Sequence, residues 1–169
     1  MKVSLFENLG NSEIFGVETV DGILQKIQNG YTKQQVELAR SYGKGTLSYQ
    51  LVKGKIETFT PNGEFFYRRA TRNLQHFSGF IYLDTDGFTN KTLFKQSDFI
   101  YACWESLSGE GLGALARVDN LDYINFKTVW QYLANYFQNK GITIDPQTKD
   151  IARQNIISYD PNIYINKGC

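Results

Sequence analysis

Two aspartates, Asp84 and Asp86, stand two residues apart at the end of the apolar run Phe80–Leu83. Positions i and i+2 of a strand point to the same face, so both carboxylates are expected on one side of a central strand. Neighbouring carboxylates raise each other's pKa unless a positive charge lies between them. A divalent cation such as Mg²⁺ prefers carboxylate oxygens and would supply that charge. The alternative is an ordinary strand end whose acids face water.

A glycine-rich stretch, Ser-Gly-Glu-Gly-Leu-Gly, occupies residues 108–113 between two apolar runs. Glycines let the backbone approach a ligand and point successive N–H groups at an anion. No Gly-Lys-Ser/Thr follows, so the stretch is not a P-loop. No helix is expected after it, which argues against a dinucleotide fingerprint. We expect a turn between two strands, which either cradles phosphate or only reverses the chain.

A third polar stretch combines Asp150 and Arg153 near the C-terminal end of the sequence. Their spacing of three would place both on one side of a helical turn. They could serve the same site as the paired aspartates, or form an exposed ion pair.

Arg68, Arg69 and Arg72 form a small basic cluster that either contacts phosphates or is a solvated face.

The elements that would position these residues alternate between strand and helix patterns. Helical spacing of apolar residues predicts helices over 18–30 and 125–137, and a capping-box pair, Thr32 and Gln35, predicts one over 32–43. Strands are expected at 2–6, 79–83 and 98–106, with a hairpin turning at 61–63. A short helix is expected within 145–154. The pattern predicts one α+β domain over residues 1–169.

The composition limits the classes of protein that the chain can represent. The 169 residues are 41% hydrophobic with a net charge of +1, so a sizeable core is expected and any basic surface has to be local. No run approaches the roughly 20 apolar residues that cross a bilayer. Cys103 and Cys169 fit no metal-ligand spacing, and a reduced, cytoplasmic setting with no membrane is expected. The ending Tyr-Ile-Asn-Lys-Gly-Cys suggests the N-terminal part of a longer protein.

The order of these motifs resembles the VirE N-terminal domain family. That family is a primase-polymerase-like branch of the archaeo-eukaryotic primase superfamily. The resemblance implies an RRM-like sheet core with flanking helices, at the start of a mobile-element or phage-type replication protein. It also implies a metal-dependent nucleotidyltransferase whose partners are a nucleoside triphosphate and single-stranded DNA or a primer-template. A helicase-type domain downstream would fit the same picture.

The resemblance assigns metal binding and catalysis to three acids. Asp84 and Asp86 would hold Mg²⁺ or Mn²⁺, and Asp150 is the best match for the third acid. Asp145 and Asp160 are the alternatives for that third position.

The resemblance also assigns the binding of the nucleotide. Ser108, Gly109 and Gly111 match the start of the motif that holds the phosphates, and Arg117 and Arg153 are candidates to neutralise them.

One departure and two rival interpretations accompany the resemblance. Gly113 stands where active primases carry a histidine, which puts template-directed synthesis in doubt. A non-catalytic domain that binds nucleic acid or a partner protein is therefore one rival. The other is a phosphatase similar to haloacid dehalogenases, in which Asp84 is the nucleophile and Asp86 the general acid on a doubly wound sheet.

Overall fold

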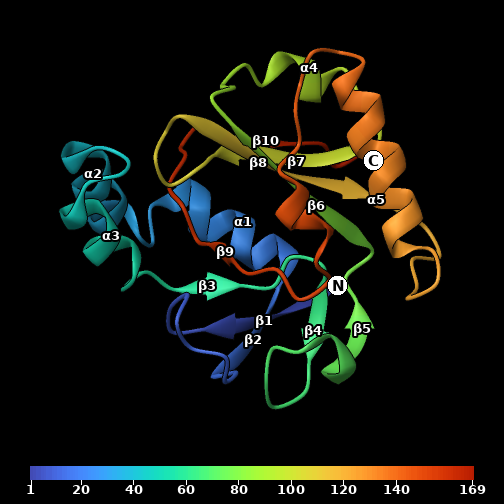
Figure 1. Ribbon diagram of the computed structural model, residues 1–169, viewed down its shortest axis with the longest axis horizontal. Helices are drawn as coiled ribbons and strands as arrows, with labels where there is room; N and C mark the ends of the chain where they lie inside the picture. The colour runs from blue at the N-terminus through green and yellow to red at the C-terminus, as the bar shows by residue number, and fades with distance from the viewer.

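Two four-stranded antiparallel sheets form the centre of the computed structural model, which describes residues 1–169 (Figure 1). The first sheet has the order β2-β1-β3-β9, with β2 at Gly16–Thr19, β1 at Lys2–Phe6, β3 at Thr58–Phe59 and β9 at Asn155–Ile156. The second has the order β10-β7-β8-β6, with β10 at Tyr164–Ile165, β7 at Ile100–Glu105, β8 at Gly111–Arg117 and β6 at Phe80–Asp86. A separate ribbon pairs β4 (Gly63–Phe65) with β5 (Leu74–Phe77).

Five α-helices and two short 3₁₀ turns surround these sheets. The helices are α1 (Val20–Asn29), α2 (Lys33–Tyr42), α3 (Leu47–Lys53), α4 (Thr92–Lys95) and α5 (Phe126–Gln138); the 3₁₀ turns are Thr71–Asn73 and Pro146–Lys149. The predicted α+β class is confirmed. All strand pairings are antiparallel, so the doubly wound sheet that the phosphatase interpretation requires is not present. None of the helices has both the length and the apolar character needed to cross a membrane.

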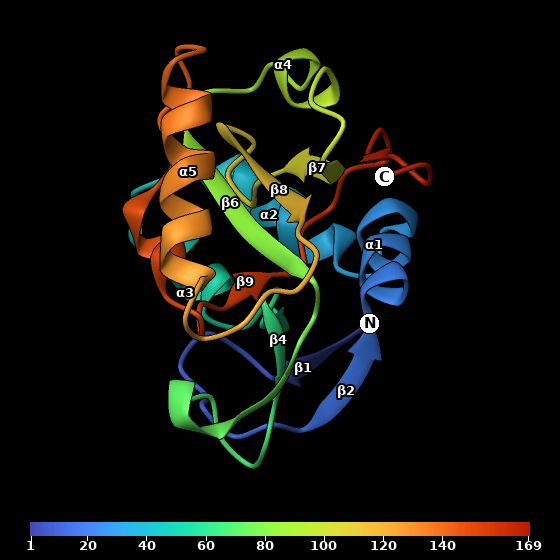
Figure 2. The same cartoon turned by 90° about the vertical axis from the view of Figure 1, so that its right-hand side faces the viewer.

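The second sheet is covered on both faces (Figure 2). On β8, Leu112 and Ala114 pack into the cluster that includes α5, whereas Leu115 packs into the cluster that includes α1 and the first sheet. Alternate residues of a strand point to opposite faces, which explains this division. Because both faces are apolar, polar side chains can gather only at the ends of these strands.

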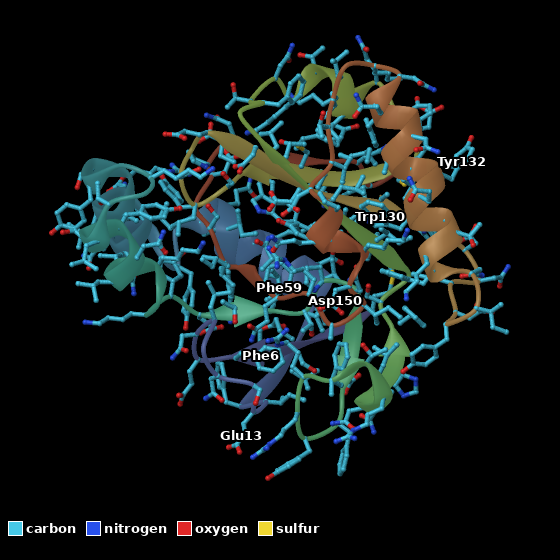
Figure 3. All side chains as sticks on the ribbon, viewed as in Figure 1. Phe6, Glu13, Phe59, Trp130, Tyr132 and Asp150 are labelled. Atoms are coloured by element: carbon cyan, nitrogen blue, oxygen red, sulfur yellow. The ribbon has the colours of Figure 1, made fainter.

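Helix α5 forms where the spacing of apolar residues predicts it. Phe126, Trp130, Leu133 and Phe137 are buried, and each stabilises the fold by about 1.5–3 kcal/mol. Tyr132 lies on the outer face and is 68% exposed, as Figure 3 shows beside the inward-pointing Trp130. The predicted helix over 125–137 is confirmed.

The N-terminal helices agree with prediction in position, but one predicted cap is wrong. Helix α1 ends at Gly30, whose φ of +82° suits glycine. Thr32 does not cap α2 with its side chain; its hydroxyl instead donates to the carbonyl of Ile157 at 2.7 Å. The hydroxyl thus binds a buried carbonyl from a distant segment, and not the helix N-terminus that the capping-box pattern predicts.

The hairpin predicted at residues 61–63 is also wrong, because β3 and β4 pair with other strands. Asn62 is fully buried and joins two distant segments. It accepts a hydrogen bond from the Tyr82 N–H at 3.0 Å and donates to the Ile151 carbonyl at 3.1 Å. This side chain therefore fixes β6 against the segment that leads to Arg153.

Candidate functional site

Asp84 and Asp86 lie at the end of β6 and line one pocket, as their spacing predicts. Between them Thr85 is buried toward the opposite face, where its hydroxyl accepts a hydrogen bond from the Leu112 N–H at 3.0 Å. Asp84 is half-buried and Asp86 is 78% exposed. The strand is at the edge of its sheet, not at the centre as predicted. The pocket opens where this edge meets the β7–β8 loop, α3 and residues 145–156.

The third carboxylate of the pocket is Asp145. Its N–H donates to the Asp84 carbonyl at 2.8 Å, and its side chain caps the 3₁₀ turn by accepting from the Gln147 N–H at 2.9 Å. Both bonds hold Asp145 beside the end of β6. The sequence had left this residue as an alternative for the third acid.

Asp150, the preferred third acid, does not reach the pocket. The predicted helix stops at Lys149, so Asp150 and Arg153 do not share one side of a helical turn. The Asp150 side chain is exposed and accepts a hydrogen bond from the Ala152 N–H. Asp160, the other alternative, is buried against Lys91 and also lies outside the pocket.

Three cationic side chains face these carboxylates: Lys44, Lys53 and Arg153. Lys44 Nζ lies 2.5 Å from Asp86, and Arg153 Nη2 lies 3.8 Å from Asp145. Arg153 also donates to the Gln147 side chain at 2.7 Å, while its buried Nε–H has no partner. Sequence reasoning missed both lysines because Lys44 lies in the connection between α2 and α3 and Lys53 at the end of α3, some 30 to 40 residues before the acids and outside any motif.

The carboxyl group of Asp84 has a strongly altered acidity. Burial is the largest cause and the nearby Asp145 carboxylate the next; together they raise its pKa to about 6, although the Arg153 guanidinium opposes the shift. Lys44 pairs with Asp86 and Arg153 with Asp145, but neither forms an ion pair with Asp84. The site thus retains one acid that has no ion pair of its own.

The predicted strand-to-strand turn is confirmed: residues 106–110 connect β7 to β8. Gly111 stands directly opposite Asp86 in the sheet, and Ser108 lines the pocket. Gly109 has a φ of +75°, which permits the reversal. The N–H groups of Leu107 and Ser108 donate to no protein acceptor. The turn therefore presents a hydroxyl at the pocket and has two unused donors in the same loop.

Arg40 of α2 braces this turn, which extends toward α2 in Figure 1. Its guanidinium donates to the carbonyls of Leu107 at 3.2 Å and Ser106 at 3.0 Å, and to that of Tyr159 at 3.1 Å. Three carbonyls from two segments thus depend on one side chain. No motif in the sequence points to this role.

Two of the glycines are required by the packing of the sheet itself. A Cβ at Gly111 would lie 2.0 Å from the Thr85 carbonyl oxygen, so glycine is needed for strand packing. A Cβ at Gly113 would lie 2.9 Å from the Trp104 indole. A histidine at Gly113 would therefore displace a core side chain, and the idea of a vacated ligand-binding position is not supported.

Arg117 is separated from the pocket by the length of β8. It pairs with Phe80 at the start of β6, six residues along the strand from Gly111, or about 20 Å. Its guanidinium donates to the Cys169 carbonyl at 2.5 Å. The expectation that Arg117 faces the phosphates is wrong, because strand register places it at the opposite end.

Comparison with known proteins assigns a family to this chain. The model of the BT4734-like, N-terminal domain family matches residues 51–165, which include β6, the glycine turn and the segment of Asp145 and Arg153. No curated protein and no solved structure matches. The resemblance to the VirE N-terminal domain family is therefore wrong; its motifs are short patterns that recur at strand ends and turns. The chain belongs to the BT4734-like N-terminal domain family.

Proposed function

We propose that the pocket binds a nucleoside triphosphate with Mg²⁺ or Mn²⁺ and catalyses nucleotidyl transfer. The observation that carries the proposal is the gathering of opposite charges in one pocket. Three carboxylates, three cationic side chains and the hydroxyl of Ser108 line it together. Carboxylates suit a hard divalent cation, whereas lysine, arginine and free amides suit phosphate oxygens.

Asp84 and Asp86 are the residues that would hold the cation, with Asp145 beside them. Asp84 carries an unneutralised carboxyl group, which is the kind of donor that a divalent cation deprotonates and binds. No three acidic, histidine or cysteine side chains converge into a complete metal centre. Phosphate oxygens and water would therefore complete the coordination. A divalent cation supplies neutralisation of phosphate charge and activation of the attacking hydroxyl.

The β7–β8 turn and the cationic side chains would hold the triphosphate. Ser108 can donate its hydroxyl, and the Leu107 and Ser108 N–H groups are free. Lys44 now neutralises Asp86, but a cation on that carboxylate would release the ammonium toward a phosphate. Arg153 has a buried Nε–H without an acceptor, which a phosphate oxygen would satisfy.

The proposal also includes the type of fold that the second sheet and its helices form. Within the second sheet the chain follows the order β6-α4-β7-β8-α5-β10, a succession of the β-α-β-β-α-β type. The succession along the chain supports the expected RRM-like sheet core. The spatial order β10-β7-β8-β6 departs from it, because β6 lies at the edge of the sheet, whereas the first strand of an RRM-like sheet is central. A second candidate function is nucleotide binding without turnover, which the incomplete set of metal ligands favours.

The test uses Asp84→Asn with Asp150→Asn as a matched control outside the pocket. Titration calorimetry with Mn²⁺ should show binding in the wild type and in Asp150→Asn, and little or none in Asp84→Asn. The wild type and Asp150→Asn should also incorporate a labelled nucleotide onto a primer, and Asp84→Asn should not. Binding without incorporation would establish the second candidate, and equal Mn²⁺ binding in all three proteins would refute both.

A further inference from the structure

The loop between β4 and β5 exposes two adjacent aromatic rings. Phe66 is 67% exposed and Tyr67 is 63% exposed, whereas the preceding Phe65 is buried. The loop projects at the lower end of the molecule, away from α4 and α5 (Figure 1). Adjacent exposed rings leave apolar area in contact with water, which suggests a surface that a ligand covers.

The loop is held firmly in this exposed position. The Phe66 N–H donates to the Asn73 carbonyl at 2.8 Å and closes the loop across its base. The Ile14 N–H donates to the Tyr67 carbonyl at 3.1 Å and ties the loop to the β1–β2 connection. The rings are therefore presented on an ordered backbone.

Tyr67 also adopts a backbone conformation that is rare for a large side chain. Its φ is +61°, in the left-handed region that favours glycine. Such strain persists only where surrounding contacts impose it, and it is concentrated at functional positions. The strain here keeps an aromatic ring where stability alone would favour glycine.

The same loop is basic. Residues 66–73 contain three arginines and no acid. The Arg68 guanidinium lies 5.2 Å from the centre of the Tyr67 ring, and Arg72 is exposed. Glu13 neutralises Arg68 at 2.7 Å, but both side chains remain more than half exposed. Aromatic rings interleaved with arginines suit a ligand with flat bases and a negative backbone.

We propose that this loop binds single-stranded nucleic acid. Bases stack on Phe66 and Tyr67, while Arg68 and Arg72 contact phosphates. A single strand is favoured over a duplex because only unpaired bases expose a face to an aromatic ring. The proposal goes beyond the nucleotide pocket and holds whether or not the pocket transfers nucleotides.

The loop has a direct connection to the pocket. Arg69 Nη1 donates to the Ala152 carbonyl at 3.0 Å, and the next residue, Arg153, lines the pocket. On the other side, the Gln154 side chain donates to the Asn11 carbonyl in the β1–β2 connection at 3.0 Å. A strand bound on the loop would consequently run beside the pocket.

Fluorescence anisotropy with a labelled oligothymidylate of about 20 nucleotides tests the proposal at low salt. Phe66→Ala combined with Tyr67→Gly should weaken binding at least about tenfold, since both rings on which bases would stack are removed. Tyr132→Ala, an equally exposed tyrosine on α5, should leave the affinity unchanged. A duplex of the same length should bind more weakly than the single strand.

Tyr67→Gly alone separates binding from folding. Glycine accepts the positive φ, so its melting temperature should stay level or rise while its affinity for the oligonucleotide falls. Arg72→Ala should reduce the salt dependence of binding by about one phosphate contact.

Three outcomes would overturn the proposal. One is that the wild type binds no oligonucleotide, another is that it binds the duplex as tightly as the single strand, and the third is that Tyr132→Ala loses as much affinity as the variant of Phe66 and Tyr67. Asp84→Asn should bind the oligonucleotide normally, so failure of the pocket and failure of the loop give different results.

Discussion

Asp84 and Asp160 are both at least partly buried, but only Asp160 has an ion pair. Asp160 is 1% exposed, forms an ion pair with Lys91, and accepts the N–H groups of Glu105 and Asn162, each at 2.9 Å. Asp84 has no ion pair, and its burial together with the neighbouring Asp145 carboxylate raises its pKa to about 6. The first acid therefore stabilises the fold, whereas the second destabilises it.

This difference indicates which acid serves a ligand. A carboxylate whose partners are all supplied by the protein has no remaining capacity for a cation. A carboxylate left without a neutralising partner at a pocket retains that capacity at a cost in stability. Proteins accept such a cost at functional sites. The comparison can be tested by removing each acid in turn.

Asp160→Ala should have the largest effect on stability. Its removal leaves the 14% exposed Lys91 ammonium without a counter-charge and leaves two N–H groups without an acceptor. Breaking a buried pair from one side costs about 3–5 kcal/mol. Urea unfolding should show this loss, and Asp150→Ala should change the free energy of unfolding by less than about 1 kcal/mol. A loss as small as that of the control would mean that Asp160 contributes no special stability.

Asp84→Asn should act in the opposite direction and depend on pH. The folded pKa of about 6 exceeds the unfolded value of 3.8, so the folded state binds the proton more tightly. Stability contributed by this group is present below pH 3.8 and is lost as the pH rises through 6. At pH 7.5 the asparagine variant should therefore be more stable than the wild type by up to about 3 kcal/mol.

The measurement is urea unfolding of both proteins at pH 4 and pH 7.5. The gain should be largest at pH 7.5 and nearly absent at pH 4, because Asp84 is then mostly protonated in the folded state. A variant less stable than the wild type at pH 7.5 would show that the Asp84 charge is neutralised after all.

Lys44→Met should have the smallest effect on stability. The pair that Lys44 forms with Asp86 is exposed, with 39% and 78% of the two side chains accessible. Such pairs contribute about 0–1 kcal/mol because water and salt screen them. Lys91→Met should be far more damaging, since it leaves the buried Asp160 unpaired. Equal losses in thermal unfolding would contradict the distinction between an open pair and a buried one.

Local sequence patterns correctly predicted several elements of the fold, including the strand that carries the paired acids. The apolar spacing of α5, the glycine that ends α1, and the strand that ends in two acids all depend on neighbours within a few residues. The turn at 106–110 follows from the same kind of local information. These features could be predicted without knowing which residues from elsewhere in the sequence pack against them.

Each failed prediction concerns a residue that contacts a part of the chain far from it in sequence. The Thr32 hydroxyl bonds to residue 157 instead of capping its helix, and Asn62 fixes β6 instead of forming a hairpin. Strand register sends Arg117 to the far end of β8. In each case a tertiary contact decided between two locally acceptable structures.

The sequence by itself determined that two carboxylates would share one face at a strand end and that a glycine-rich turn would join two strands, because these features follow from the period of a strand and the freedom of glycine. The pairing of β6 with β8 then placed that turn beside the acids. Only the tertiary structure decided that Asp145 and not Asp150 joins them, that Lys44 reaches the pocket from the connection between α2 and α3, and that Arg40 of α2 braces the turn. Residues separated by about 40 to 70 positions in the sequence meet through packing of sheets and helices. The same packing sets the acidity of Asp84, because burial and neighbouring charges exist only in the folded protein.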